Sequence, residues 1–247
     1  MITLYQFSPT WGIPNLGQFC VKIETYLRMT GLSYNVVETL PLKGPKGKLP
    51  FIEDDGQKIT DSRFIIEHLK AKYGDPLDGD LSSEQRAIMT ALQRLLEEHL
   101  YWIGMYARWQ TTDENWQITK KAVFGGLPPV IRDIAALVYR WIVIRKQIYG
   151  QGIGRHNADE IFHLGEIDLD ALSVFLADKP YFMGGKPTSL DASAFGILIN
   201  TVHGPIESPV KEYGMRKKNL ITYCDRMMIE FYPEMMDTNQ RGNLASL

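Results

Sequence analysis

Two short stretches decide the fold of this sequence: Gly47-Lys48-Leu49-Pro50-Phe51-Ile52 and Ile59-Thr60-Asp61-Ser62. The first predicts a strand over 49–54 that opens on a proline, and Asp55-Gly56 after it is a strong signal for a tight hairpin turn. The second completes the hairpin with a strand over 57–60, and Ser62 then begins a helix that runs to Tyr73. The rest of the chain is arranged around this hairpin and helix.

Pro50 and the pair Asp61-Ser62 each have a structural and a functional interpretation. Pro50 is either an edge residue that starts a strand, or it follows a cis peptide bond that turns the backbone of the preceding residue towards a ligand. Asp61 and Ser62 either cap the helix, or the Ser62 hydroxyl and the first-turn amides hold a carboxylate while Asp61 accepts from an ammonium group. The residues alone leave both interpretations open.

Upstream of the hairpin, the pattern predicts a strand over 2–7, a helix over 19–29 and a strand over 34–38. The order β-α-β, hairpin, helix suits a small α/β sandwich. Residues 74–80 then form an acidic, turn-rich linker of the kind that separates domains.

Every element predicted after the linker is a helix. The helices are expected from 83 to about 109, from 128 to about 148, from 158 to about 177, from 188 onwards and from 219 to 232. We therefore predict an α+β two-domain protein, with an α/β domain over 1–76 and an all-helical domain over 83–247.

Composition bounds the function without naming it. The 247 residues carry 27 Lys and Arg against 29 Asp and Glu, a net charge of −2, and 45% are hydrophobic. This balance argues against disorder and against a nucleic-acid coat. Two cysteines, no secretory leader and no apolar run near the roughly 18 residues of a membrane span predict a soluble, cytoplasmic protein without a membrane anchor.

The two opening stretches resemble the signature G-K-[VL]-P…[TV]-[DEQ]-S of the glutathione transferase superfamily. The resemblance implies that the N-terminal domain is thioredoxin-like and binds glutathione, with a cis bond before Pro50. It further implies that the backbone of Leu49 pairs with the cysteinyl unit and that Asp61 and Ser62 bind the γ-glutamyl end. Lys48 is the implied contact for the glycyl carboxylate.

Two further matches extend the resemblance over essentially the whole chain. Thr188-x-x-Asp191 is similar to the buried capping box of the family's helical domain, which is a folding device. Phe19-Cys20-x-Lys22-x-Glu24 and Gly150-Gln151-Gly152-Ile153-Gly154-Arg155-His156 look like motifs of the branch that contains failed axon connections and the metaxins. Metaxins carry a C-terminal membrane anchor, which the sequence over 242–247 lacks.

The position of the family's catalytic residue is where this sequence departs from the pattern. Transferases of the superfamily keep a Ser, Tyr or Cys at the end of the first strand or the start of the first helix, where it lowers the pKa of the glutathione thiol. Gly17 falls in that position here. Cys20 occupies the place of the second cysteine in a C-x-x-C, so dithiol chemistry is disfavoured and monothiol chemistry remains an alternative.

Other groups are candidates for the missing role. The hydroxyl of Ser8 or Thr10 is predicted to reach the thiol, and Trp11 to cover the site and line a pocket for the electrophile. The structural interpretation is that these residues only shape a proline turn and pack. A backbone amide at the start of the first helix is the third possibility. Tyr106, Arg108 and Trp109, near the end of the long helix, are predicted to form the floor of the electrophile pocket.

The sequence thus predicts a glutathione transferase that conjugates the thiolate of glutathione, its co-substrate, to a small hydrophobic electrophile. The five histidines show no metal-ligand spacing, so we expect no metal. The resemblance implies a homodimer, and no nucleic-acid partner is expected. The rival hypothesis is a non-catalytic, metaxin-like interaction module with a vestigial glutathione cleft. A third option, glutathione-dependent reduction through Cys20, lacks the second thiol.

Overall fold

The fold is described for residues 1–235 of a computed structural model. Its strands are β1 (Ile2–Gln6), β2 (Tyr34–Glu38), β3 (Phe51–Asp54) and β4 (Gln57–Thr60). They form one sheet in the order β2-β1-β3-β4, in which β1 and β2 are parallel and β3 is antiparallel to both of its neighbours. Asp55 and Gly56 both have positive φ, at 49° and 80°, as the predicted tight hairpin turn requires.

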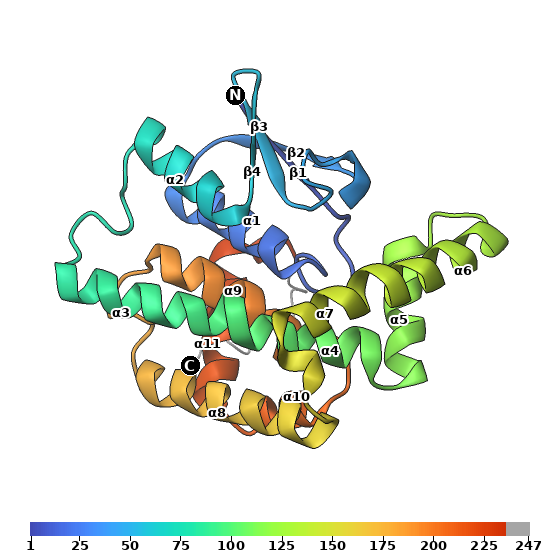
Figure 1. Ribbon diagram of the computed structural model, residues 1–247. Helices are drawn as coiled ribbons and strands as arrows, with labels where there is room; N and C mark the ends of the chain where they lie inside the picture. Colours follow the sequence, from blue (N-terminus) through green and yellow to red (C-terminus); the bar gives the residue numbers. More distant parts are fainter. Residues whose placement is uncertain (236–247) are drawn as a thin grey trace.

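Helices make up the rest of the described chain (Figure 1). Those of the first part are α1 (Gln18–Thr30), η1 (Pro41–Lys43) and α2 (Ser62–Tyr73). Those that follow are α3 (Ser83–Arg94), η2 (Leu95–Leu100), α4 (Tyr101–Gln110), α5 (Asp113–Phe124), α6 (Pro129–Val138), η3 (Tyr139–Ile144), α7 (Arg145–Gln151), η4 (Ile153–Arg155), α8 (Ala158–Leu176), α9 (Ser189–Val202), α10 (Pro209–Met215), α11 (Lys218–Phe231) and η5 (Pro233–Met235).

The predicted fold class is confirmed: a thioredoxin-like sheet and its helices precede an all-helical part. The sequence pattern missed two of the helices, α5 and α10. It also gave no sign that the two long helices each contain a π-helical segment, η2 and η3. The division into domains at 76 and 83 stays a prediction.

Helix α1 lies between the sheet and α9, which explains why nine of its 13 residues are buried. Ile23, Tyr26 and Leu27 pack with the apolar side chains of the sheet and α2. The other side of α1 meets α9, where Gly196 is required because a Cβ there would lie 2.4 Å from the carbonyl oxygen of Gln18. Ala192 of α9 belongs to the same apolar cluster as the sheet. The two halves of the protein are therefore packed together along α1.

The capping box predicted at the start of α9 is present. The Asp191 carboxylate accepts from the backbone amide of Thr188 at 2.8 Å and from that of Phe182 at 2.9 Å. Burial raises the pKa of Asp191 to about 6, against the effect of these hydrogen bonds. The capping box is thus a structural feature that stabilises the helical part, as expected.

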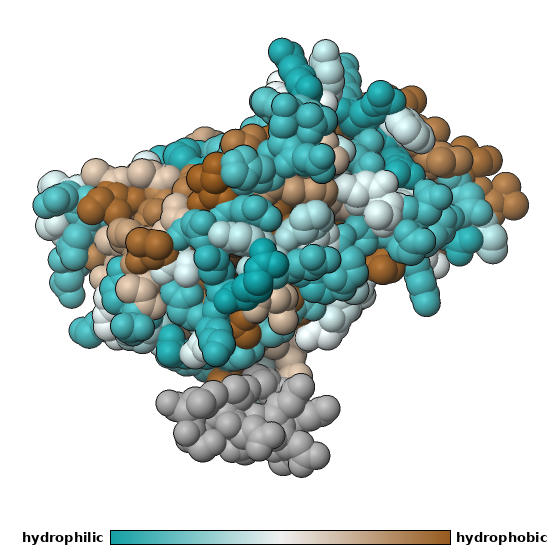
Figure 2. All heavy atoms as spheres, turned by 90° about the horizontal axis from the view of Figure 1, so that it is seen from below, coloured by the Kyte–Doolittle hydropathy of each residue, from teal (hydrophilic) through white to brown (hydrophobic). Residues whose placement is uncertain are grey.

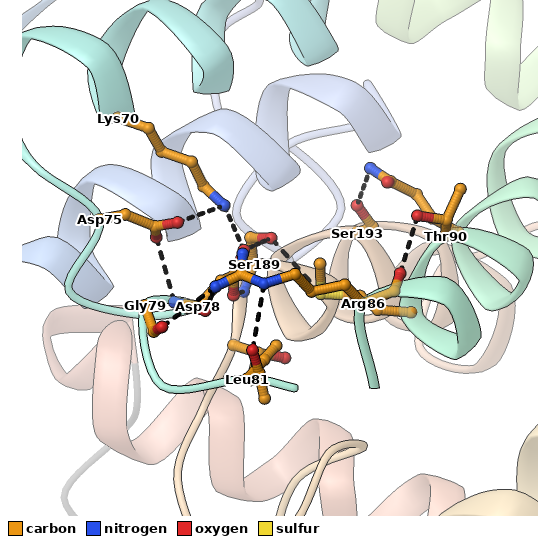
Figure 3. Close-up of polar contacts among 12 residues, drawn as sticks. Lys70, Asp75, Asp78, Gly79, Leu81, Arg86, Thr90, Ser189 and Ser193 are labelled. Carbon is orange, nitrogen blue, oxygen red and sulfur yellow. Dashed lines mark hydrogen bonds and ion pairs between the residues drawn. The ribbon is translucent and has the colours of Figure 1, made fainter. Parts of the chain in front are cut away.

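The acidic linker is folded onto both halves (Figure 3). The side chain of Asp78 is buried and accepts from the Ser189 amide at 2.8 Å, from the Ser189 hydroxyl and from the Lys70 ammonium. Arg86 of α3 donates to the carbonyl oxygens of Asp78 and Gly79 at 2.6 and 3.1 Å. Asp78 therefore joins α2 to the N-terminus of α9, which a free tether would not do.

After α4 the chain makes an excursion before it returns to the body at α8. Helix α5 follows α4 and ends at Phe124. The chain then turns at Gly125-Gly126 and continues as one helical run from Pro129 to Gln151. Figure 1 shows α6 projecting beyond the rest of the molecule at the right. Within residues 1–235, no single helix is long and apolar enough to cross a membrane, although α5 and the run 129–151 pass that test as a bent pair. The sequence over 242–247 lies outside the described residues.

Candidate functional site

The strand register brings the opening motifs together at one end of the sheet. Tyr5 of β1 pairs with Phe51, and Phe51 pairs with Thr60. The next residue along each strand must therefore lie in the adjacent row, which places the end of β1 beside Pro50 and Asp61. The start of α1 completes this edge.

The Leu49–Pro50 peptide bond is cis, as the resemblance implies. Pro50 is buried, Leu49 is half-buried and Lys48 is exposed. The segment before β3 thus presents the backbone of Leu49 near the surface with a cation next to it. The roles of Lys48 and Leu49 in binding glutathione stay predictions.

Asp61 and Ser62 occupy the N-terminus of α2 in different ways. Asp61 is exposed, has a positive φ of 75°, and its carboxylate accepts from the backbone amide of Arg63 at 3.0 Å. Ser62 is buried, and its hydroxyl oxygen accepts a hydrogen bond from the Lys22 ammonium at 3.0 Å. Because an ammonium group only donates, the hydroxyl proton of Ser62 is left to be donated to a ligand. An anionic group at this helix N-terminus is favoured by the same geometry.

Behind Ser62 lies a buried polar cluster that the sequence pattern did not reveal. The ammonium of Lys22 pairs with Glu97 at 2.6 Å, and both side chains are buried. Glu97 also accepts from Gln93 at 3.0 Å and from Ser193 at 2.7 Å. Burial lowers the pKa of Lys22, and the Glu97 carboxylate opposes that shift. The cluster fixes Ser62 from α1, η2 and α9, and its one sequence signal was a lysine in an otherwise apolar stretch of α1.

The loop after β1 distinguishes the two hydroxyls predicted to activate the thiol. Ser8 is exposed, and its hydroxyl donates to the carboxylate of Glu38 at the end of β2. Thr10 is half-buried, and within residues 1–235 its hydroxyl has no hydrogen-bond partner. Thr10 is therefore the hydroxyl that is free to turn towards a bound thiol.

Trp11 has an unusual backbone at the tip of this loop. Its φ is 64° and that of Gly12 is 71°, so two successive residues are left-handed, and the turn is closed by the amide of Ile13 donating to the carbonyl of Thr10 at 3.3 Å. A tryptophan in that region costs free energy, and such strain is concentrated at functional sites. The Trp11 ring is held in place over the Arg108 guanidinium, 4.9 Å from its ring centre.

Arg108 is a buried cation beside the start of α1. It donates to the carbonyl oxygen of Leu16 at 2.9 Å and to the side-chain oxygen of Asn200 at 3.0 Å. None of the described carboxylates forms an ion pair with it. Burial lowers its pKa to about 10, so the guanidinium is still charged at neutral pH. This charge adds to the positive end of α1, whose first turn no described side chain caps.

Gly17 and Cys20 are in close contact at the start of α1. A Cβ at Gly17 would lie 2.9 Å from the Cys20 sulfur and 3.1 Å from the ring of Phe7, so a serine or cysteine at this position would require those side chains to shift. Burial raises the pKa of the Cys20 thiol to about 12. An inaccessible thiol that stays protonated cannot act as a nucleophile, and this contradicts the alternative of monothiol chemistry through Cys20.

A pocket of about 630 Å³ lies between the loop after β1 and helix α5. Its lining residues are Phe7, Ser8, Pro9, Thr10, Trp11, Leu16, Thr39, Leu40, Ile118, Lys121, Ala122, Val123, Gly125, Gly126 and Pro205. Most of these side chains are apolar, and Lys121 is the one charged residue among the described residues that line it. Ser8, Thr10 and Trp11 all line this pocket, and their roles towards the thiol and the electrophile stay predictions.

Tyr106 is not among the residues that line this pocket. Its ring packs edge-on against Phe162 of α8, with 5.9 Å between the ring centres. Its predicted contact with the electrophile therefore has no support from this pocket. The helical part contributes α5 instead, an element that the sequence pattern missed. Over residues 1–235, no group of three or more His, Cys, Asp or Glu side chains is arranged to hold a metal ion.

Comparisons with known proteins agree with this architecture. The sequence model of the "Glutathione S-transferase N-terminal domain" matches residues 18–115, and that of the "Glutathione S-transferase, C-terminal domain" matches residues 165–227. An isoprene-epoxide–glutathione S-transferase of a Rhodococcus species is 38% identical over 94% of this chain and 99% of its own length. Failed axon connections of Drosophila melanogaster is also 38% identical over 95% of this chain, which spans only 59% of that longer protein. Mouse metaxin-1 is 29% identical, over 93% of this chain and 75% of its own.

Among solved structures, human glutathione-S-transferase T1-1 superposes with a TM-score of 0.61. The match covers 99% of this chain and 89% of the human chain at 15% identity. At that identity the likeness concerns the fold alone.

Proposed function

This chain belongs to the glutathione S-transferase family, in the branch that includes failed axon connections and the metaxins, and on that premise we propose that it conjugates glutathione to a small apolar epoxide. The observation that carries the proposal is the apolar pocket of about 630 Å³ beside an intact set of glutathione-type positions. The epoxide is suggested by the printed substrate of the Rhodococcus relative, which this chain matches over nearly its full length.

In this proposal, glutathione lies along the edge of the sheet where the strand register brings the end of β1, Pro50 and Asp61 together. Its γ-glutamyl carboxylate lies at the N-terminus of α2, where it accepts the Ser62 hydroxyl proton, and its ammonium group donates to Asp61. The cysteinyl unit pairs with the backbone of Leu49 as an added strand does, and the exposed Lys48 takes the glycyl carboxylate. The thiol then lies at the end of β1, next to the pocket.

Three features lower the pKa of that thiol. The Thr10 hydroxyl, which has no other described partner, donates to the sulfur. The uncapped first turn of α1 presents backbone amides and the positive end of the helix. Behind them, Arg108 supplies a buried positive charge. Fixed donors and charges of this kind stabilise a thiolate without covalent chemistry by the protein.

The conjugation itself is a displacement at an epoxide carbon. The thiolate forms the C–S bond, the C–O bond of the ring breaks, and the resulting alkoxide takes up one proton. We assign that proton to the Lys121 ammonium, which lines the pocket from α5. Trp11, Ile118 and Val123 hold the apolar part of the epoxide close to the sulfur.

Calorimetric titration with glutathione tests the binding half of the proposal. The wild-type protein is expected to bind at millimolar ligand or below. Ser62→Ala is expected to weaken binding by about 10-fold or more, because a hydrogen bond to a charged group contributes about 1.5–3 kcal/mol. Ser33→Ala, an exposed serine in the loop before β2, is the matched control. No binding by the wild-type protein, or equal affinity in the Ser62 and Ser33 variants, would contradict the proposed site.

A second candidate function is a non-catalytic interaction module with a vestigial cleft. Two observations favour it: Gly17 provides no catalytic side chain, and failed axon connections and metaxin-1 are among the relatives. Turnover separates the two candidates. Glutathione binding without detectable conjugation to a small alkyl epoxide would support the module and reject the transferase. A homodimer, a cytoplasmic location and chemistry without a metal stay proposals that accompany the first candidate.

A further inference from the structure

Helix α6 and the start of η3 expose a continuous apolar face that the rest of the described chain does not cover. We define the α6 face as Val130, Ile131, Ile134, Leu137, Val138, Trp141 and Ile142. Val130, Ile142 and Ile134 are 72%, 63% and 61% exposed. The seven residues of the α6 face recur at spacings of three and four, which places them on one side of the helix. Figure 2 shows apolar side chains gathered at the right-hand end of the molecule, where Figure 1 places α6.

The opposite side of the same helical run is the one that packs on the body. Ala136, Ile144 and Ile148 are buried there. Arg140 donates to the carbonyl oxygen of Trp109 at 2.7 Å, and its guanidinium lies 4.7 Å from the centre of the Trp116 ring. The buried side of the helical run therefore attaches it to the core, and the α6 face takes no part in that packing. A contiguous exposed apolar face of this kind marks an interaction surface.

The charge of the run from Pro129 to Gln151 indicates the kind of partner. It contains Arg132, Arg140, Arg145 and Lys146 against a single acidic residue, Asp133, in a chain whose net charge is −2. The Asp133 carboxylate is already paired with Arg132 at 3.0 Å and with Lys120 at 3.3 Å.

Two cations of this run, Arg145 and Lys146, pair with none of the described carboxylates and lie at the end of the apolar face. Arg145 and Lys146 are exposed, and the Arg145 guanidinium lies 5.0 Å from the centre of the Trp141 ring. Tyr149, one turn further on, is 57% exposed. An apolar helix face with tryptophan, tyrosine and unpaired cations beside it is the composition of helices that lie in a membrane interface.

We propose that the α6 face docks on the surface of a lipid bilayer that contains anionic lipids. The helix lies in the plane of the interface with its apolar side chains among the acyl chains, and Arg145 and Lys146 contact the anionic headgroups. Lying in the surface is favoured over spanning, because α5 and the run 129–151 meet at a bend of 114° and the inner side of each packs on the protein.

A second copy of the chain fits this face less well than anionic lipid does. Two α6 faces in contact would bring no carboxylate to Arg145 and Lys146, because the one acidic residue of the run is engaged by Arg132 and Lys120. An anionic bilayer supplies both an apolar layer and negative charge.

Co-sedimentation with vesicles tests the proposal, using phosphatidylcholine alone and phosphatidylcholine mixed with phosphatidylserine. The wild-type protein is expected to bind the mixed vesicles more tightly, and less so as salt is raised. Ile134→Glu is expected to abolish binding. Arg145→Glu is expected to weaken binding to the mixed vesicles by about 5-fold or more, and to leave the weaker binding to phosphatidylcholine nearly unchanged. Val174→Glu, on the exposed side of α8 where the valine is 79% exposed, is the control that should bind as the wild type does.

Sedimentation velocity on the same proteins identifies the competing outcome. If the wild-type protein does not bind either vesicle and is a dimer that Ile134→Glu dissociates, the α6 face is a contact between copies and the proposal is wrong. Equal vesicle binding by the Ile134 and Val174 variants would contradict it as well. Unchanged glutathione affinity in Ile134→Glu shows that the variant is folded, since Ile134 is not among the residues assigned to glutathione, which are Lys48, Leu49, Asp61 and Ser62.

Discussion

Single residues decide which chemistry the cleft is able to perform. Gly17 stands where the family keeps a catalytic side chain, and a Cβ there would lie 2.9 Å from the buried sulfur of Cys20, so a larger residue would require that side chain to shift. In the proposed transferase, thiol activation falls to groups around that position, namely the Thr10 hydroxyl, the first turn of α1 and the charge of Arg108. The sequence named Ser8 and Thr10 as equivalent candidates. Only the structure separates them, because the partner of Ser8, Glu38, comes from another strand.

The proposed role of Lys121 as the proton donor to the epoxide oxygen leads to a specific prediction. Lys121→Met is expected to lower turnover with an epoxide by about 100-fold, the lower end of what a positioned acid contributes. Turnover with an aryl halide is expected to change little, since a halide ion leaves without needing a proton. Steady-state kinetics on both substrates measures the difference.

The control for this experiment is Lys120→Met. Lys120 is the neighbouring lysine, but its ammonium pairs with Asp133 and does not line the pocket. Equal losses on both substrates, or the same loss in the Lys120 variant, would show that Lys121 does not protonate the leaving oxygen.

At the scale of elements, the motifs that were local in sequence could be predicted and the contacts between distant elements could not. The hairpin at Asp55-Gly56, the caps of α2 and α9 and the long helices all follow from residues close together in the chain. Helix α5 was missed although Thr112 caps it and Asp113 and Glu114 lie in its first turn. Its apolar residues Ile118, Ala122 and Val123 line the pocket, and the sequence pattern did not identify them as one side of a helix. The cluster of Lys22, Glu97 and Ser193 joins three elements, and its one local signal was the lysine within an apolar stretch of α1.

The contact between β3 and α2 gives an acid-stability prediction. Burial acts to raise the pKa of Asp54, but hydrogen bonds from Lys72, His68 and Tyr73 outweigh it and hold the pKa at about 2. A folded-state pKa below the unfolded value of about 3.9 means that the ionised group stabilises the fold above pH 4 and that this contribution is lost as the pH falls towards 2.

Asp54→Asn is therefore expected to be less stable than the wild type near pH 6 and to lose less of its remaining stability on acidification through this window. Urea denaturation at a series of pH values measures both effects. Asp178→Asn, in the exposed turn after α8, should follow the wild-type curve. A parallel curve for the Asp54 variant would rule out the proposed contribution.

At the scale of the whole molecule, the two halves are held together by buried polar contacts as well as by apolar packing. Composition and patterning predicted two parts and a linker, but they suggested a simple spacer. The carboxylate of Asp78 in that linker is instead buried against α2 and the start of α9, as Figure 3 shows. No local pattern reports such a contact, because Ser189 lies far along the chain from Asp78.

Asp78→Asn is accordingly expected to destabilise the protein by about 3 kcal/mol, the cost of removing one partner from a buried ionic contact. Chemical denaturation measures this loss, with Asp80→Asn in the same linker as the exposed control. We expect both halves to unfold in one transition in the wild type. A change within error of that of the Asp80 variant would mean that the linker is a passive tether.

We propose that this cleft binds glutathione and ionises its thiol without a side chain at position 17. The ultraviolet absorbance of the thiolate in the glutathione complex, followed as a function of pH, tests it most directly. We expect the bound thiol to ionise well below the free-thiol pKa of about 8.5. Binding with ionisation only at the free-thiol pKa would contradict it and leave a cleft that holds glutathione but does not activate it.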